Sequence, residues 1–129
     1  MSSPNNDGEQ NGCASNNGFA KHLNWSTIPV DQPAEGIERQ MIVGDNIMIC
    51  RFRFAPLLVT PEHDHSHEQM TIVERGRVKF FIEGKEQIAC AGDVLHFPSY
   101  CWHGATMMDK EVVLIDIFSP VREDFLQGS

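Results

Sequence analysis

The sequence predicts an all-β domain, a sandwich or small barrel of about eight short strands. Short runs of β-branched and aromatic residues recur between residues 37 and 118, and turn residues separate them. No segment with helical periodicity exceeds about ten residues. These three observations exclude helical bundles and α/β folds as the class of this domain.

The expected strands follow in chain order, and a turn signal ends each of them. The strands are Ile37–Val43, Ile47–Phe54, Gln69–Arg75, Val78–Glu83, Gln87–Ala91, Val94–Phe97, Gly104–Met108 and Val112–Phe118. The separators are Gly44–Asp45, Ala55–Pro56, Gly76, Gly84, Gly92–Asp93, Pro98 and Asp109–Lys110. Glycine, proline, aspartate and asparagine favour turns because of their backbone preferences and local hydrogen bonds. Residues 120–126 are expected to form one helical turn.

The first 18 residues differ in composition from the rest of the chain. They are rich in serine, asparagine and glycine and hold no large aliphatic side chain after the initial methionine. Such a segment cannot bury enough apolar surface to fold by itself. We therefore expect a flexible tail over residues 1–18 and a single domain over residues 19–129.

Composition and charge exclude several function classes. The chain has 129 residues and a formal net charge of −8, and its basic residues form no stripe, so nucleic acid is not an expected partner. Its longest purely apolar stretches are four residues, far too short to cross a membrane. The four cysteines form no Cys-x-x-Cys pair, which favours free buried thiols. No signal-peptide pattern opens the chain, and a reducing cytoplasm is the expected location.

Three of the six histidines fall within five residues, as His63, His65 and His67. In extended chain, residues two apart face the same side, so His63 and His65 can present their imidazoles together. Gln69 has the same parity, and His103 can join from a distant strand. This set suits zinc, iron, nickel or copper. The alternative is a surface loop between two strands, here residues 61–69, that simply contains histidines.

The spacing of these residues resembles that of a known family. His63-x-His65-(x)3-Gln69-(x)6-Gly76 is similar to the first cupin motif, and Gly92-(x)5-Pro98-(x)4-His103 is similar to the second. The resemblance implies a double-stranded β-helix jelly roll, the cupin barrel. It also implies one divalent metal ion, with zinc, nickel, iron and manganese all open, held by His63, His65, Gln69 and His103. A homodimer, formed through a sheet face or a swapped N-terminal strand, is expected on the same ground.

The sequence departs from the cupin motifs at four positions. Leu57 and Tyr100 stand where the motifs have glycine, and Met107 stands where the second has asparagine. Gln69 replaces the usual glutamate, so three neutral imidazoles and a neutral amide would leave the charge of the metal uncompensated. Such a site favours an anionic ligand and differs from the two-histidine, one-carboxylate centres of many oxygenases.

The last expected strand carries one charged residue, Asp116. Parity places it on one face with Val112, Leu114 and Phe118, and a buried carboxylate is unfavourable unless it is paired or hydrogen-bonded. An ion pair with Arg122 is one interpretation, and an acid/base role beside a metal is another, compatible one.

Residues 116–126 resemble the ending of the pectin-degradation cupins, the KdgF group. That resemblance implies that a 4,5-unsaturated uronate monosaccharide from pectin or alginate is opened to its linear keto form. It assigns Asp116 as acid/base, Arg122 as carboxylate clamp and Phe118 as a wall of the site, with a small anionic sugar as substrate. A metal-dependent oxygenase or lyase acting on another small molecule, and a non-catalytic sugar- or metal-binding module, remain alternatives. We interpret His67 and His96 as structural or rim residues, and Tyr100 and Trp102 as rim or packing residues.

Overall fold

The computed structural model describes residues 15–17 and 20–127. Its elements before the histidine cluster are β1 (Ser15–Asn17), β2 (Ala20–His22), a 3-10 turn η1 (Trp25–Thr27), β3 (Asp31–Ala34), β4 (Ile37–Val43), β5 (Met48–Phe54) and β6 (Val59–His63). The later elements are β7 (Glu68–Arg75), β8 (Arg77–Ile82), β9 (Lys85–Cys90), β10 (Val94–Phe97), β11 (His103–Met107), β12 (Val112–Ser119) and α1 (Glu123–Leu126).

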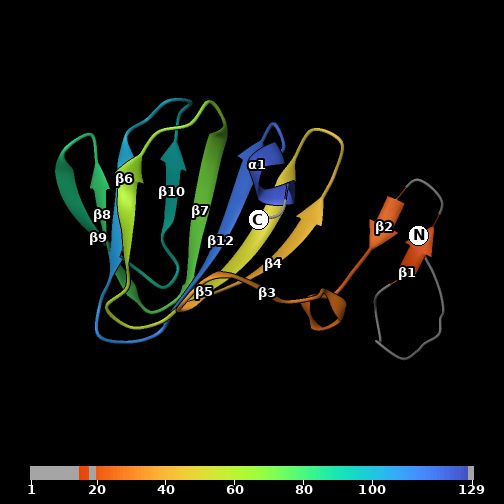
Figure 1. The fold of residues 1–129 in the computed structure, drawn as a ribbon, viewed down its shortest axis with the longest axis horizontal. Helices are drawn as coiled ribbons and strands as arrows, with labels where there is room; N and C mark the ends of the chain where they lie inside the picture. Colours follow the sequence, from red (N-terminus) through yellow and green to blue (C-terminus); the bar gives the residue numbers. More distant parts are fainter. Residues whose placement is uncertain (1–14, 18–19, 128–129) are drawn as a thin grey trace.

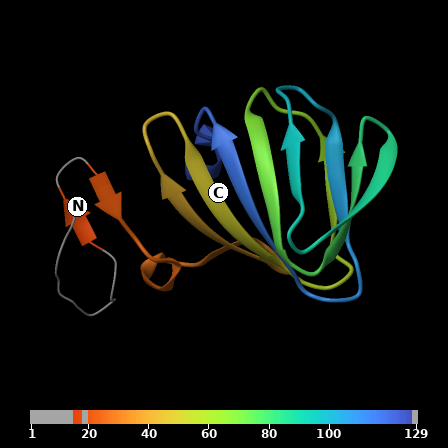
Figure 2. The same ribbon diagram turned by 180° about the vertical axis from the view of Figure 1, so that it is seen from behind.

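Two antiparallel sheets form the body of the domain. The larger has the strand order β10-β7-β12-β5-β4-β3, and the smaller has the order β6-β11-β8-β9. The sheets face each other as the two walls of an open barrel, and the short strands β1 and β2 lie to one side of it (Figures 1 and 2). The prediction of an all-β jelly roll is confirmed.

The inner face of the large sheet follows directly from residue alternation. Along β5 every second residue is buried, beginning at Met48, while the residues between them are half-buried. Phe52 and Phe54 stack with ring centroids 5.5 Å apart. Phe80 on β8 of the small sheet contacts Phe97 on β10 of the large sheet at 5.8 Å, which joins the two walls. A strand buried on one face requires this period of two.

Strand register brings the polar inner residues together. Asp116 on β12 lies between Cys50 on β5 and Thr71 on β7, and the next row places Phe118 beside Gln69. Paired residues of neighbouring strands share a face of the sheet. The side chains of Asp116 on β12 and Thr71 on β7 therefore point to the same side.

All eight expected strands are present with ends within two residues of those predicted, and α1 confirms the helical turn. The expected loop over residues 61–69 is partly wrong, because β6 includes Pro61 and His63. Strand β3, which contains Pro33, was also not predicted, and neither were the short strands β1 and β2. Strands β3 and β6 lie at sheet edges, where a residue without an N–H group breaks no ladder, so proline is compatible with a strand there.

The backbone explains two of the departures from the cupin motifs. Leu57 and Tyr100, which replace glycines, have φ angles of 67° and 64°. This left-handed region is unfavourable for side chains with a Cβ atom. The motif glycine Gly76 has φ of 88°, and a Cβ there would lie 2.5 Å from the Glu111 carbonyl oxygen. The two substitutions therefore keep a glycine-like backbone at the expense of local strain.

Several expectations concern the chain ends and the thiols. The expected tail lies outside the described residues except for Ser15–Asn17, which pairs with β2. Cys50 and Cys101 are free and buried, as expected, whereas Cys90 is free but exposed, which corrects the prediction of buried thiols at that position. None of the helices in the described chain has the length and apolar character needed to cross a membrane.

Candidate metal centre and cavity

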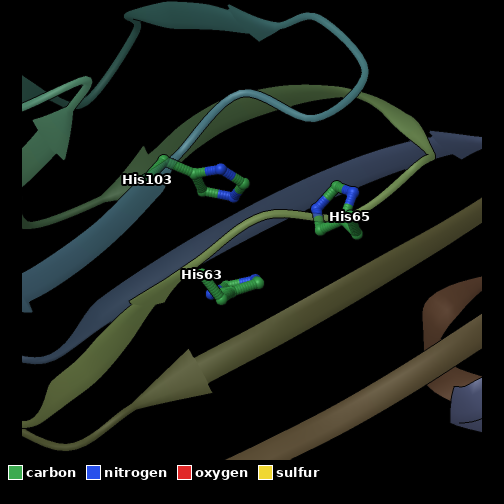
Figure 3. A group of neighbouring side chains, drawn as sticks. All are labelled: His63, His65 and His103. Atoms are coloured by element: carbon green, nitrogen blue, oxygen red, sulfur yellow. The ribbon is translucent and has the colours of Figure 1, made fainter.

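Three imidazoles from three places in the chain meet at one end of the barrel. His63 ends β6, His65 follows in the next loop, and His103 begins β11, where it pairs with His63 in the strand register. Their rings face a common space (Figure 3), and the potential ligand nitrogens all lie within 4.8 Å of one another. The parity argument for His63 and His65 is confirmed by this arrangement.

Backbone carbonyls fix the tautomer of each ring. The Nδ1 atoms of His63, His65 and His103 lie 3.1, 2.9 and 2.8 Å from the carbonyl oxygens of Pro61, His67 and Cys101. A carbonyl only accepts, so in the neutral form of each ring Nδ1 carries the proton and Nε2 keeps its lone pair. Second partners of this kind are typical of histidines that ligate metals.

A polar chain connects His65 to the buried carboxylate. The Gln69 amide donates to the Thr71 hydroxyl at 2.9 Å, and that hydroxyl donates to Asp116 Oδ1 at 2.6 Å. The Gln69 Oε1 atom is thereby turned toward His65 Nε2, 3.1 Å away. Inside the barrel, Gln69 therefore has a polar partner at each end of its amide group.

Burial changes the protonation of these groups. It lowers the pKa of His65 to about 4, with a further contribution from the nearby Arg122, and it also lowers the pKa of His103. Burial raises the pKa of Asp116 to about 6, which the Thr71 hydrogen bond and Arg122 partly oppose. At neutral pH the imidazoles of His65 and His103 are therefore neutral and able to bind a cation.

The donor set fits a divalent metal ion. Since neutral His65 has its one proton on Nδ1, its Nε2 and the Gln69 Oε1 atom are two lone-pair donors facing each other. A cation that accepts both lone pairs resolves this contact. His63, His65 and His103 could hold the ion, and imidazole nitrogens suit zinc, nickel, iron and manganese to different degrees.

A cavity of about 260 Å³ opens beside the histidines. Six of the seven residues expected at the site line it, and the seventh, His65, contacts the Phe118 ring edge-on at a centroid distance of 5.9 Å. The six lining residues are His63, Gln69, His103, Asp116, Phe118 and Arg122. The residues selected from the sequence therefore form part of the lining of this cavity.

Arg122 has a different partner from the one considered in the sequence. It forms a two-pronged pair with Asp124, with distances of 3.0 and 2.8 Å, and its guanidinium lies over the rings of Phe125 and Phe118 at 4.2 and 5.0 Å. The alternative of an Asp116–Arg122 ion pair is wrong in this structure, because the Asp116 hydrogen bond comes from Thr71. Arg122 acts on Asp116 only through its field.

Sequence reasoning missed Arg39 and Thr71. Both are buried and line the cavity. Strand β4 alternates Ile37, Arg39 and Met41 on one side, so the parity used for Asp116 would have flagged Arg39 as a charge facing inward.

The remaining aromatic and histidine side chains lie at the edge of the site or outside it. His96 is exposed and pairs with Glu68 at 2.7 Å, as a rim residue does. His67 is half-buried, and its Nδ1 atom is enclosed without a partner among the described residues. Tyr100 and Trp102 are exposed and do not line the cavity.

Residues 50–118 match the family described as Cupin domain. The chain belongs to the cupin family. The matched segment holds the four expected metal-binding residues together with Asp116 and Phe118, whereas Arg39 and Arg122 lie outside it.

Known relatives of this cupin include a pectin degradation protein. The pectin degradation protein KdgF of Dickeya dadantii is 34% identical over 100 residues, which cover 76% of this chain and 91% of that protein. The structure of KdgF from Halomonas sp. superposes with a TM-score of 0.72 at 27% identity, covering 75% of this chain and 90% of the other. An RmlC-like cupin from Shewanella frigidimarina gives a TM-score of 0.76 at 29% identity, covering 82% and 96%.

Proposed function

We propose that this cupin is a metal-dependent enzyme that opens the ring of 4,5-unsaturated uronate monosaccharides. The observation that carries the proposal is a buried carboxyl group, Asp116, in one small cavity that an arginine and two of the three convergent imidazoles line. The similarity to proteins of pectin degradation supports the choice of a uronate.

The reaction is an isomerisation and needs no oxidant. The hemiacetal hydroxyl on C1 gives up its proton, the bond between C1 and the ring oxygen breaks, and C4 of the enol ether gains a proton. An aldehyde and a ketone result. The protein must therefore take a proton from one atom, deliver one to another, and hold the substrate carboxylate still.

Asp116 suits the proton transfer. Its pKa of about 6 lets the carboxyl both accept and release a proton near neutral pH. Its hydrogen bond from Thr71 fixes the orientation of the group toward the cavity. Asp116 would thus act as the general acid/base, and Thr71 as its positioning residue.

One divalent ion would be held by His63, His65, Gln69 and His103. When bound, it would polarise a substrate oxygen as a Lewis acid. The neutral ligands leave its charge uncompensated, which favours an anionic substrate.

Arg122 would bind the substrate carboxylate in a two-pronged pair, and Phe118 would form the wall behind the sugar ring. Asp124 now occupies the fork of Arg122, but its side chain is 57% exposed and belongs to the same short turn. A substrate carboxylate can therefore take its place at small energetic cost.

The cavity restricts the size of the ligand. Its volume of about 260 Å³ lies below the usual range for drug-sized ligands and suits a monosaccharide rather than a polymer. The formal charge of −8 makes the overall field repel an anion, so affinity must come from the metal and Arg122.

The direct test follows the loss of the enol-ether absorbance of uronates generated by a pectate lyase, with NMR detection of the keto product. Wild-type protein loaded with metal should consume the substrate, and Asp116→Asn should not. Equal decay of the substrate with both proteins, at the uncatalysed rate, would reject the proposed function.

We also propose a homodimer in the cytoplasm. A row of apolar residues crosses the outer face of four strands, pairing Ile42 with Ile49, Ile49 with Ile117, and Ile117 with Met70. Continuous apolar rows on an outer sheet face favour association. Sedimentation velocity should give twice the monomer mass, and a monomer at working concentration would contradict the dimer.

A further inference from the structure

Arg39 places a second positive charge inside the barrel, away from the histidines. Only 7% of the residue is exposed, and it lines the same cavity as Asp116. Its neighbours in the row across the sheet are apolar, Phe52 on β5 and Leu114 on β12. Burying a guanidinium in such surroundings is unfavourable unless its N–H groups have hydrogen-bond partners. The partners of Arg39 show how the group is held, and any free N–H group shows where a ligand could bind.

The guanidinium is held in one orientation. Asp31 lies directly opposite Arg39 in the pairing of β3 with β4, and its carboxylate accepts from Nε at 3.1 Å and from Nη2 at 2.7 Å. The Phe125 ring covers the group at 5.1 Å. The strand register and the aromatic ring therefore orient the fork before any ligand enters.

One nitrogen of this fork is left for a ligand. Within the described residues, Nη1 of Arg39 makes no hydrogen bond, and it is not among the enclosed polar atoms that lack a partner. Nη1 is therefore not enclosed, and Arg39 lines both the cavity and a smaller pocket of about 80 Å³ that Glu38 and Arg53 border. Of these two spaces, the cavity is the one that also contains the other residues of the proposed site. Since Asp31 already neutralises the charge, the free N–H groups are suited to hydroxyl and ring oxygens rather than to a second carboxylate.

We propose that Arg39 is a specificity-determining residue that binds the hydroxyl-bearing end of a small sugar acid. The sugar-acid class rests on the proposed function. Arg122 would take the carboxylate, because its partner Asp124 lies in the same turn and can be displaced, whereas the Asp31 pair is built into the sheet. Arg39 lies two strands and two residues away from Asp116, a Cα separation of about 12 Å by strand spacing, so it recognises the end of the sugar remote from the proton transfer.

The test compares Arg39→Met with a matched control, Arg51→Met. Arg51 makes a two-pronged pair of the same geometry with Glu74, at 3.1 and 2.8 Å, on the other face of the same sheet. Both changes remove one arginine–carboxylate pair and keep an unbranched apolar side chain. Arg39→Lys keeps the charge and the pair with Asp31, and it serves as the test if Arg39→Met does not fold.

Two measurements are made on metal-loaded protein. In turnover of the unsaturated uronate, Arg39→Met should raise KM by about tenfold or more and change kcat by less than about threefold, as expected for a lost hydrogen bond to a charged group. In calorimetric titration with D-galacturonate, a saturated uronate that cannot react, Arg39→Met and Arg39→Lys should bind at least about tenfold more weakly than wild type. Arg51→Met should match wild type in both.

The experiment distinguishes a failure of the role of Arg39 from a failure of the ring-opening function. Binding of galacturonate that is equal in wild type and Arg39→Met, or absent from wild type, would overturn the role of Arg39. Binding that depends on Arg39 in a protein with no turnover would uphold that role and reject ring opening alone.

Discussion

Replacing Asp116 by asparagine is expected to stabilise the metal-free domain in a pH-dependent way. Burial raises the pKa of this carboxyl from its ordinary value of 3.8 to about 6 in the folded protein. The folded state therefore favours the protonated form. The contribution of Asp116 to stability is fully present below pH 3.8 and is lost as the pH rises through 6, because the unfolded chain releases this proton more easily.

The magnitude follows from the two pKa values. One pKa unit corresponds to about 1.4 kcal/mol, so the difference between 3.8 and about 6 amounts to about 3 kcal/mol above pH 7. About 2 kcal/mol of this develops between pH 4.5 and 7.5, a range in which the domain can be studied conveniently. Asparagine has no proton to lose and can still accept a hydrogen bond from Thr71. The free energy of unfolding of the variant therefore does not contain this pH-dependent decrease.

The assay is urea unfolding followed by tryptophan fluorescence, on protein treated with a chelator, at several pH values between 4.5 and 7.5. The free energy of unfolding of Asp116→Asn minus that of wild type should rise by about 2 kcal/mol across this range. Asp109→Asn, at an exposed turn, serves as the control for the removal of one solvent-exposed carboxylate. A difference that stays flat within about 0.5 kcal/mol would refute the burial argument for Asp116.

Three further changes test other parts of the site and fold. His103→Ala should lower the metal content measured by elemental analysis, because it removes one of three convergent imidazoles, while His96→Ala should leave it unchanged; unaltered stoichiometry in His103→Ala would reject the ligand set. Arg122→Lys should raise KM for the uronate by about tenfold, since an ammonium cannot form the two-pronged pair, and an unchanged KM would exclude Arg122 as the clamp. Leu57→Gly should stabilise the domain by up to about 1 kcal/mol in urea unfolding, because φ of 67° suits glycine and the side chain is 70% exposed. Val59→Gly, on the neighbouring strand, should instead destabilise it by about 1 kcal/mol, and equal losses in the two variants would contradict the strain at Leu57.

Alternation and turn residues were sufficient to predict most of this fold. The central strands are buried on one face and follow a period of two, so their positions could be read directly from the sequence. Two of the strands that were not predicted, β3 and β6, contain proline and lie at sheet edges. Whether a strand lies at an edge depends on how distant segments of the chain pair, and a single sequence contains no direct signal for this pairing.

The candidate site was predictable where short-range spacing decides it. His63 and His65 share a face by parity, and the isolated charge of Asp116 on an apolar strand marked it as unusual. The partners of these groups depend on strand register and on the path of the last turn. For this reason Thr71 was missed as the donor to Asp116, and Arg122 was considered as a partner of Asp116 although it pairs with Asp124.

In the proposed function, the three-histidine centre and Asp116 together open the ring of an unsaturated uronate. The most direct measurement is the initial rate of loss of enol-ether absorbance as metal is titrated into chelator-treated protein, with bound metal quantified in the same samples. We predict a rate that rises in proportion to bound metal and saturates at one ion per chain, with Asp116→Asn inactive at full occupancy. A rate independent of bound metal, or equal rates for wild type and Asp116→Asn, would contradict the proposed function.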